Sequence, residues 1–412
     1  MEWVEDSRFT ENNRRNMSIW HAVHRSHLSN GRRSTVKTHL SLFMKCLLLT
    51  LLVVSQVNAS GVIEIETNRG RMEIVTMAKQ LPHFGLGDWE RDLEYTMGFI
   101  TNYEKAPSLT APYFAGSIKP EMLEDALNCL KMIRYLVGVP VDVSLTDALN
   151  NSAQHKAVLA ASIGIIAHDL PQLPDMDDGF FALTRWDTQG LSESMALHSG
   201  EANISAQLLA LIGDKGHDNI GAVGHRLQLI EPQTTEYGIG YADTSSNPDA
   251  LIPGHYVVVH SRWSTANFNS FIAWPNSGHC PIQYFAQTSF PQAFHYNMSM
   301  TPWSLSLGSD YLTPNRNEIK LVLTRYRDNR SWVFDSSTPN LAELDFEVYQ
   351  GRVMDHLAVS NNTIIFRPGN LTIEDEDVFA VSLMGIKAAD GISTTLNYEI
   401  TFFDLDKEVA TR

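Results

Sequence analysis

The chain has only three cysteines in 412 residues, and it lacks the short signatures by which many enzymes are recognised. There is no Gly-rich phosphate loop leading into a helix, no Gly-x-Ser-x-Gly turn and no His-Glu-x-x-His segment. The absence of any Cys-x-x-Cys pair excludes a zinc ribbon. Cys129 and Cys280 lie far apart in the sequence, so their spacing leaves a disulfide and two separate core thiols equally open.

Long apolar runs are also missing, apart from one short segment. Met44-Lys45-Cys46 precedes an apolar run from Leu47 to Val54, and small residues follow up to Ala59. This order predicts a cleavable export signal over residues 44–59 and therefore a secreted protein. The run is much shorter than the roughly 20 residues of a membrane-spanning helix. An uncleaved signal anchor is the alternative, because residues 40–43 extend the apolar run before Lys45.

The polar residues 1–43 are predicted to be an unstructured extension, and residues 60–112 a leader segment. Residues 1–59 carry eight basic and four acidic side chains, so the net charge changes from −16 for the whole chain to −20 after cleavage. Such an acidic surface repels nucleic acids and anionic lipids, which argues against both classes of partner. The same charge favours cations.

The mature chain is predicted to begin with helices and to continue with strands. A helix is expected after Lys119-Pro120, and a second one from about Leu145 to Ala167, where His168-Asp-Leu-Pro171 ends it. A short helix is expected over residues 205–212. Runs rich in β-branched and aromatic residues predict strands at 237–241, 255–261, 318–326, 331–334, 363–366, 378–384 and 395–403.

Histidine is the residue type that gathers most clearly, since nine of the fifteen lie between residues 155 and 295. A single histidine is most often a partly buried polar side chain with one hydrogen bond. His168 and His225 stand out from this background. His168 follows the predicted end of a helix, where a side chain can turn into a cleft, and His225 lies in a Gly-His-Arg segment.

Several short segments, taken in order, resemble the CAP superfamily of cysteine-rich secretory, antigen 5 and pathogenesis-related one proteins, in its bacterial form with few cysteines. They are Tyr113-Phe-Ala-Gly116, Ala126-Leu-Asn128, Ile133-Arg-Tyr135, Ala153-Gln154, His168, Asn203-Ile204, Val223-Gly-His-Arg226 and Gly238-Ile-Gly240. The resemblance covers about residues 113–262. It implies an α-β-α sandwich with a cleft, and an exported chain.

The resemblance also implies a tetrad of two histidines and two acids in that cleft. His168 and His225 resemble the two histidines, and Glu201 resembles the first acid. Asp214 is a candidate for the second. Two imidazoles and carboxylates suit a divalent cation such as Zn²⁺, with His168 and His225 as the metal ligands. A hydrogen-bonded polar cluster that braces the cleft is the alternative.

These observations predict an α+β protein with a CAP domain over residues 113–275 and an all-β sandwich over residues 276–412. The predicted function is extracellular binding of a small or lipid-like ligand or of another protein. A metal-dependent hydrolase or peptidase is one alternative. Another is an adhesive or carbohydrate-binding protein acting through the sandwich, in which exposed tryptophans would stack on sugars. For most of Trp263, Trp274, Trp303 and Trp332, however, we expect packing in a core or at a domain interface. The acidic run of residues 374–377 is expected to be a solvated loop, with a calcium site as the alternative.

Overall fold

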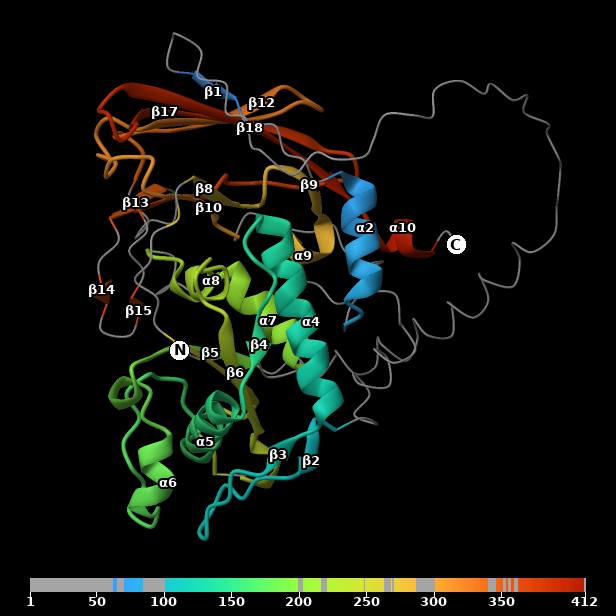
Figure 1. Ribbon diagram of the computed structural model, residues 1–412, viewed down its shortest axis with the longest axis vertical. Helices are drawn as coiled ribbons and strands as arrows, with labels where there is room; N and C mark the ends of the chain where they lie inside the picture. The colour runs from blue at the N-terminus through green and yellow to red at the C-terminus, as the bar shows by residue number, and fades with distance from the viewer. Residues whose placement is uncertain are drawn as a thin grey trace, which may run out of the picture. The chain divides into compact units, whose positions relative to one another are not determined.

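The computed structural model describes residues 62–64, 70–83, 101–198, 203–215, 221–247, 249–262, 268, 270–286, 301–339, 346–350, 353–354, 357–358 and 362–410. The predicted extension 1–43 and export signal 44–59 lie outside these ranges. The chain from Val53 to Arg412 forms one compact unit. It contains both helices and sheets, which confirms an α+β protein (Figure 1). No helix in the described ranges is long and apolar enough to cross a membrane.

A four-stranded sheet with the strand order β4-β6-β7-β5 organises the first half of this unit. Its strands are β4 (Ser144–Leu145), β5 (Leu191–His198), β6 (Glu236–Asp243) and β7 (His255–Arg262). β7 is antiparallel to both β5 and β6, whereas β4 runs parallel to β6. β6 and β7 match the strands predicted at 237–241 and 255–261. β5 was not predicted from the sequence.

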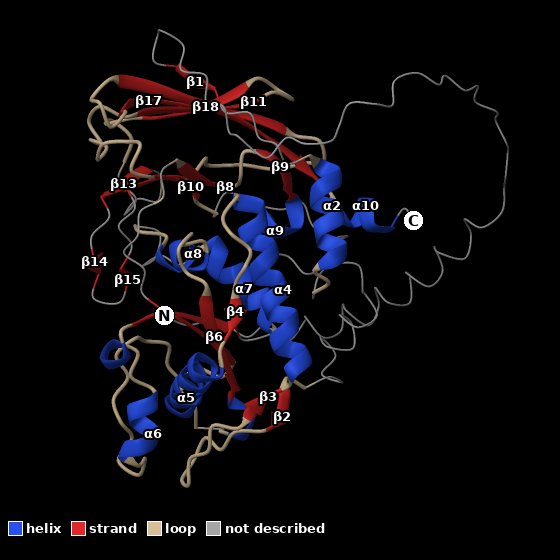
Figure 2. Cartoon of the chain, viewed as in Figure 1, coloured by secondary structure: helices blue, strands red, loops and turns tan. Residues whose placement is uncertain are grey.

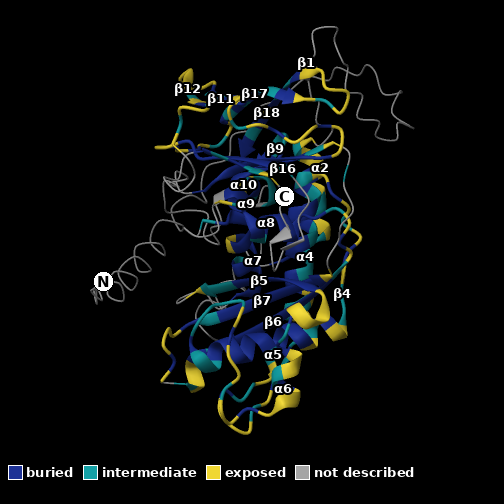
Figure 3. Ribbon diagram, turned by 90° about the vertical axis from the view of Figure 1, so that its left-hand side faces the viewer, coloured by how far each residue is buried: buried dark blue, intermediate teal, exposed yellow. Residues whose placement is uncertain are grey.

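Helices cover both faces of this sheet (Figures 1 and 3). On one face lies α5 (Asp147–Ile163), followed in the chain by the short α6 (Asp178–Leu183). On the other face lie α4 (Pro120–Val137), α7 (Ile204–Gly213) and α8 (Gly224–Leu229). The predicted helices after Pro120 and near residue 205 are therefore confirmed.

α5 ends four residues before the predicted end at Ala167. Gly164 adopts a left-handed conformation with φ of 77° and ends the helix. A Cβ at this position would lie 2.2 Å from the backbone nitrogen of Leu251, so the crossing chain leaves room only for glycine. His168 consequently lies in a loop and not at the helix end itself.

Two glycines of β6 allow α5 to pack directly on the sheet. A Cβ on Gly240 would lie 2.2 Å from the carbonyl carbon of Ala153, and one on Gly238 would lie 2.1 Å from that of Leu149. Both contacts are with helix backbone, which cannot move aside as a flexible side chain would.

We therefore expect Gly240→Ala to lower the free energy of unfolding by about 1–3 kcal/mol, the usual range for overpacking a core. Urea denaturation monitored by circular dichroism measures this loss. Gly221→Ala is the matched control, because a Cβ at Gly221 meets no atom within 4 Å. Equal losses in the two variants would contradict the close-packing explanation.

Two further sheets face each other in the second half of the unit (Figure 2). One has the order β1-β18-β17-β11-β12, with β9 also paired to β18. Its strands are β1 (Val62–Glu64), β9 (Gly278–Pro281), β11 (Lys320–Arg325), β12 (Arg330–Phe334), β17 (Val378–Lys387) and β18 (Ser393–Phe403). The other has the order β13-β16-β10-β8 and consists of β8 (Phe271–Trp274), β10 (Trp303–Leu307), β13 (Phe346–Gln350) and β16 (Asn362–Phe366).

Aromatic rings fill the space between these two sheets. Trp303 of β10 contacts Phe366 in its own sheet and Phe379 and Phe402 in the opposite sheet, with ring centroids 5.5–6.1 Å apart. Trp274 and Trp303 are fully buried, so the prediction that most tryptophans pack in the interior is confirmed for both. Trp332 donates from its indole to the carbonyl of Gly369. Trp263 lies outside the described residues.

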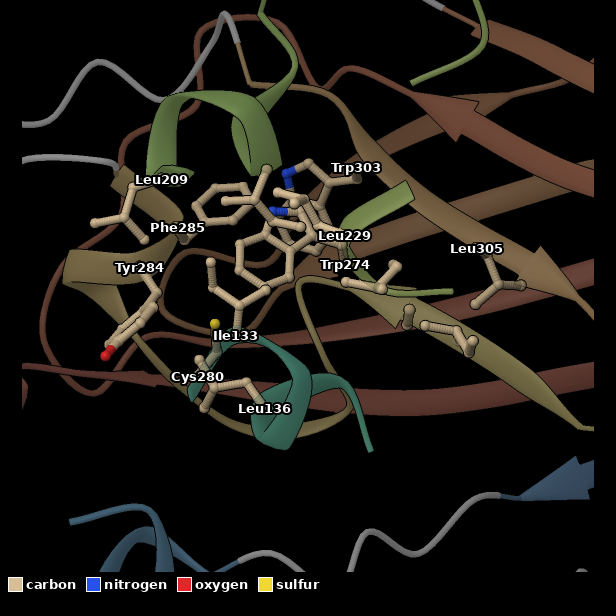
Figure 4. Close-up of a cluster of buried hydrophobic side chains, with 14 of the residues drawn as sticks. Ile133, Leu136, Leu209, Leu229, Trp274, Cys280, Tyr284, Phe285, Trp303 and Leu305 are labelled. Carbon is tan, nitrogen blue, oxygen red and sulfur yellow. The ribbon is translucent and has the colours of Figure 1, made fainter. Parts of the chain in front are cut away.

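One hydrophobic core runs through the helices and both of these sheets. Figure 4 shows Ile133 of α4, Leu209 of α7 and Leu229 of α8 in the same cluster as Trp274 and Trp303. The helices α4, α7 and α8 are thus buried between the four-stranded sheet and the sheet that contains β8 and β10 (Figure 3). This continuity crosses the predicted boundary at residue 275. β8 precedes that boundary, and β1 comes from the predicted leader segment, yet both strands belong to the second half.

The remaining elements are short. They are α2 (Arg71–Gln80), β2 (Tyr103–Lys105), β3 (Ser117–Ile118), η1 (Asp187–Gln189), η2 (Thr244–Ser246), α9 (Ile282–Ala286), β14 (Val353–Met354), β15 (Leu357–Ala358) and α10 (Leu405–Ala410). Each acidic side chain from Glu374 to Asp377 is paired with a cation: Arg327, Lys407 or Arg71. The run is only partly solvated, because Asp377 is 3% exposed. Cys129 and Cys280 are buried free thiols.

The carboxylate of Asp406 at the start of α10 is poorly accommodated at neutral pH. Burial, and to a smaller extent the neighbouring charge of Asp404, raises its pKa to about 6, although Gln283 donates a hydrogen bond to it at 3.1 Å. Because the folded pKa exceeds the unfolded one, the folded state binds the extra proton between about pH 4 and 6. Stability from this group is therefore present at low pH and is lost as the pH rises through 6.

Asp406→Asn keeps an acceptor for Gln283 and removes the charge. We expect it to raise the free energy of unfolding by about 1 to 2 kcal/mol at pH 7.5, a value reduced for partial solvent screening. The difference from the wild type should vanish near pH 4. Thermal melts of both proteins across this range measure it, and a constant difference at all pH values would contradict the titration of Asp406.

Candidate functional site

Glu193 of β5 lies at the centre of a buried charged cluster. Its side chain is 0% exposed. The strand that carries it has the sequence Leu-Ser-Glu-Ser-Met-Ala-Leu-His, which contains no β-branched residue and therefore gives a weak strand signal. β5 forms nonetheless because it pairs with β7 along its whole length, from Leu191 opposite Arg262 to His198 opposite His255.

Three cationic or potentially cationic side chains surround the Glu193 carboxylate. His168 Nδ1 lies 3.0 Å from Oε1, and His260 Nε2 lies 2.9 Å from Oε2. Lys156 Nζ lies 3.5 Å from Oε1. His260 is opposite Glu193 in the β5–β7 ladder, so both side chains point to the same face of the sheet. That face is the one covered by α5, which supplies Lys156.

The electrostatics of the cluster favour an ionised Glu193. Burial acts to raise the pKa of this carboxyl, but hydrogen bonds from His168 and His260 and the charge of Lys156 outweigh it, and the pKa is lowered. Burial lowers the pKa of Lys156, while Glu193 opposes that shift. Because an ionised carboxylate only accepts hydrogen bonds, the protons lie on Nδ1 of His168 and Nε2 of His260.

The cluster continues towards the surface on two sides. His260 Nδ1 lies 3.1 Å from the hydroxyl of Ser152, which also contacts the carbonyl of Leu183 at 3.0 Å. The His168 carbonyl accepts hydrogen bonds from Lys156 and from the indole of Trp186. The imidazole of His168 is 27% exposed, whereas Glu193 and His260 are completely buried.

A second histidine–acid pair lies on the opposite face of the four-stranded sheet. His225 Nδ1 is 3.1 Å from Oδ1 of Asp214, and Oδ2 of the same carboxylate accepts from the backbone of Arg226. His225 belongs to α8. Gln228 of that helix donates to the hydroxyl of Ser261, a residue that points away from the face carrying Glu193 and His260.

The structure thus divides the four residues suggested by sequence. It brings His225 and Asp214 together but pairs His168 with Glu193 on the other face, so the predicted shared cleft for His168 and His225 is not formed. The physical reason is that α5 and α8 cover opposite faces of one sheet. Glu201 lies outside the described residues. Among the described residues, no group of three or more His, Cys, Asp or Glu side chains is arranged to hold a metal ion.

Sequence reasoning missed Glu193, Lys156, Ser152 and His260. His260 lies in the run 255–261, which was predicted as a strand but not assigned to the site. Lys156 and Ser152 lie one turn apart in a predicted helix. This spacing indicates a shared site only when the strand that carries Glu193 is known to face that helix. Glu193 carried no comparable signal, because it lies between Ser192 and Ser194 in a segment without β-branched residues.

A surface pocket of about 420 Å³ lies elsewhere, at residues of α2 and at Tyr135 of α4. None of the residues that line it belongs to the Glu193 cluster, so we base the site on the hydrogen-bond geometry. The chain matches no protein-family model and no curated protein.

Proposed function

We propose that this protein is an extracellular binding or interaction protein of the CAP type. Three observations support the proposal: the predicted export signal at residues 44–59, the order of the segments that resemble the superfamily, and helices on both faces of the four-stranded sheet. A shared fold does not by itself define an activity. The chemistry of the site therefore has to decide between binding and catalysis.

Binding is favoured over catalysis because both carboxylate oxygens of Glu193 already have hydrogen-bond partners. Both of its oxygens contact an imidazole, Lys156 approaches one of them, and the carboxylate is 0% exposed. A hydrolase that activates water needs a base within hydrogen-bond reach of that water. Glu193 is unsuited to this role, and its network instead holds β5, β7, α5 and the loop of His168 in one arrangement. We infer that the loop around His168 presents the recognition surface.

The partner class follows from charge. A mature chain of charge −20 disfavours nucleic acids and anionic lipids. A neutral lipid-like molecule or another extracellular protein remains, and His168 is the member of the cluster that such a ligand would touch.

The test has two arms on the secreted, purified chain. Panels of peptide and ester substrates should give no turnover above the blank, for the wild type and for Glu193→Gln alike. A fluorescent sterol should bind saturably, and His168→Ala should weaken its binding, whereas His155→Ala on α5 should not. Turnover by the wild type that disappears in Glu193→Gln would replace the binding proposal with a hydrolase.

A serine hydrolase is the second candidate, favoured by one specific observation. Ser152, His260 and Glu193 form a hydrogen-bonded chain in the order hydroxyl, imidazole, carboxylate, with distances of 3.1 and 2.9 Å. Ser152 is only 1% exposed and lies beneath Leu183 and Gln189, so substrate could reach it only after these residues moved. Covalent labelling by a fluorophosphonate that is lost in Ser152→Ala would establish this candidate. Its absence would exclude it.

A further inference from the structure

His198, His255 and Asp243 form a row across three strands at one end of the four-stranded sheet. His198 of β5 is directly opposite His255 of β7, and His255 is directly opposite Asp243 of β6. Directly opposed residues of an antiparallel pair point to the same face, with Cβ atoms about 4.5–5.5 Å apart. The three side chains therefore lie on one face, the one opposite to Glu193 and His260.

This row is accessible to solvent, unlike the Glu193 cluster. His198 is exposed, and His255 and Asp243 are half-buried. His198 is the last residue of β5, and His255 is the first residue of β7. The row therefore lies at the edge of the sheet where these strands end, and not at its centre, which the helices cover.

His255 is held in an orientation that suits a metal ligand. Its Nδ1 lies 2.7 Å from the hydroxyl of Tyr241, whose ring stacks on it with an interplanar angle of 18°. Metal-binding histidines usually donate one ring N–H to a neighbouring acceptor, which fixes the ring and leaves the other nitrogen for the ion. The hydroxyl oxygen of Tyr241 can act as such an acceptor. When Nδ1 donates to Tyr241, Nε2 of His255 carries the lone pair.

A carboxylate beside the row also favours a bound cation. A neutral imidazole is the form that binds metal. Asp243 contributes negative charge beside it, while its Oδ1 accepts from the backbone of Ser245 at 2.9 Å.

We propose that His198 and His255 form an open two-imidazole site for a first-row divalent cation such as Zn²⁺, with Asp243 as the neighbouring carboxylate. Water completes the coordination, because two protein ligands leave the remaining positions open. Asp243 contributes charge and is not a third ligand, since no group of three or more His, Cys, Asp or Glu side chains among the described residues is arranged to hold an ion. The site is distinct from the His168 surface, so it goes beyond the proposed binding function.

The experiment is a calorimetric titration of Zn²⁺ into the full secreted chain, free of any affinity tag. We expect one saturable ion per chain, absent in His198→Ala and in His255→Ala, and weakened by about tenfold in Tyr241→Phe, which removes only the outer hydrogen bond. His155→Ala and His225→Ala are the controls and should bind as the wild type does. Because a ligand specific for the folded state stabilises it, Zn²⁺ should also raise the melting temperature of the wild type but not that of His255→Ala.

Wild-type binding by both His198→Ala and His255→Ala would overturn the proposal, as would loss of the ion in His225→Ala. Melting curves without metal show whether each variant is folded. The sterol and turnover assays above do not depend on this ion, so the two proposals fail independently.

Discussion

Lys156→Met should lower the free energy of unfolding by about 3–5 kcal/mol, the usual result of breaking a buried ion pair by removing one partner. Methionine has nearly the length of lysine and is apolar, so packing is largely kept. Glu193 loses its one fully cationic neighbour and stays buried with no access to water. The carbonyl of His168 also loses a donor. Chemical denaturation at pH 7 measures the loss.

The double variant Lys156→Met with Glu193→Gln is the matched control. It removes both charges together, and Gln can still contact His168 and His260. We expect it to recover a large part of the loss, because burying an uncompensated charge is more costly than burying a neutral amide. Equal destabilisation of the single and double variants would contradict the charge-pair explanation and would assign the effect to packing alone.

Arg226→Met should destabilise the protein by a similar amount, about 3–5 kcal/mol, because several buried carbonyls lose their donor at once. The guanidinium of Arg226 is fully buried and donates to the carbonyls of Ile212 and Gly213 at the end of α7. It also donates to the carbonyl of Pro302 and the hydroxyl of Ser304 at β10. It thereby joins the helical layer to the neighbouring sheet.

Arg226→Lys provides the graded comparison. Lysine keeps the positive charge but lacks the planar fork that reaches four acceptors at once, so it should restore only part of the stability. Denaturation curves of the three proteins at pH 7 give the order wild type, Lys, Met. A lysine variant as stable as the wild type would show that the positive charge, and not the hydrogen-bond geometry, stabilises the contact between the helices and the neighbouring sheet.

Much of the secondary structure could be predicted because it depends on local patterns. Pro120 at the start and Gly138 at the end define α4, and β-branched runs define β7 and β11. α5 was placed correctly but made too long, since the left-handed Gly164 is forced by contact with Leu251 from a distant loop. β5 was missed because its stability comes from its ladder with β7 and not from its own residues.

The candidate site was only partly predictable, for a related reason. His168 and His225 were both recognised as unusual, and each does contact a carboxylate. The sequence could not show that a sheet lies between them, since the face on which a helix packs is decided by tertiary contacts. Glu193 and Lys156 are 37 positions apart in the sequence. They meet only because α5 packs on β6 and β7, on the face of the sheet to which Glu193 points.

By itself, the sequence determined the α+β class, the larger helices, the strands β11, β12, β16, β17 and β18 of the second half, and the acidic net charge. These properties depend on composition or on neighbours a few residues away. The tertiary structure alone decided which histidine meets which acid, and it joined the helices and the second pair of sheets through one core. Such pairings depend on strand register and on the face each helix covers, and both are set by burial of side chains that are distant along the chain.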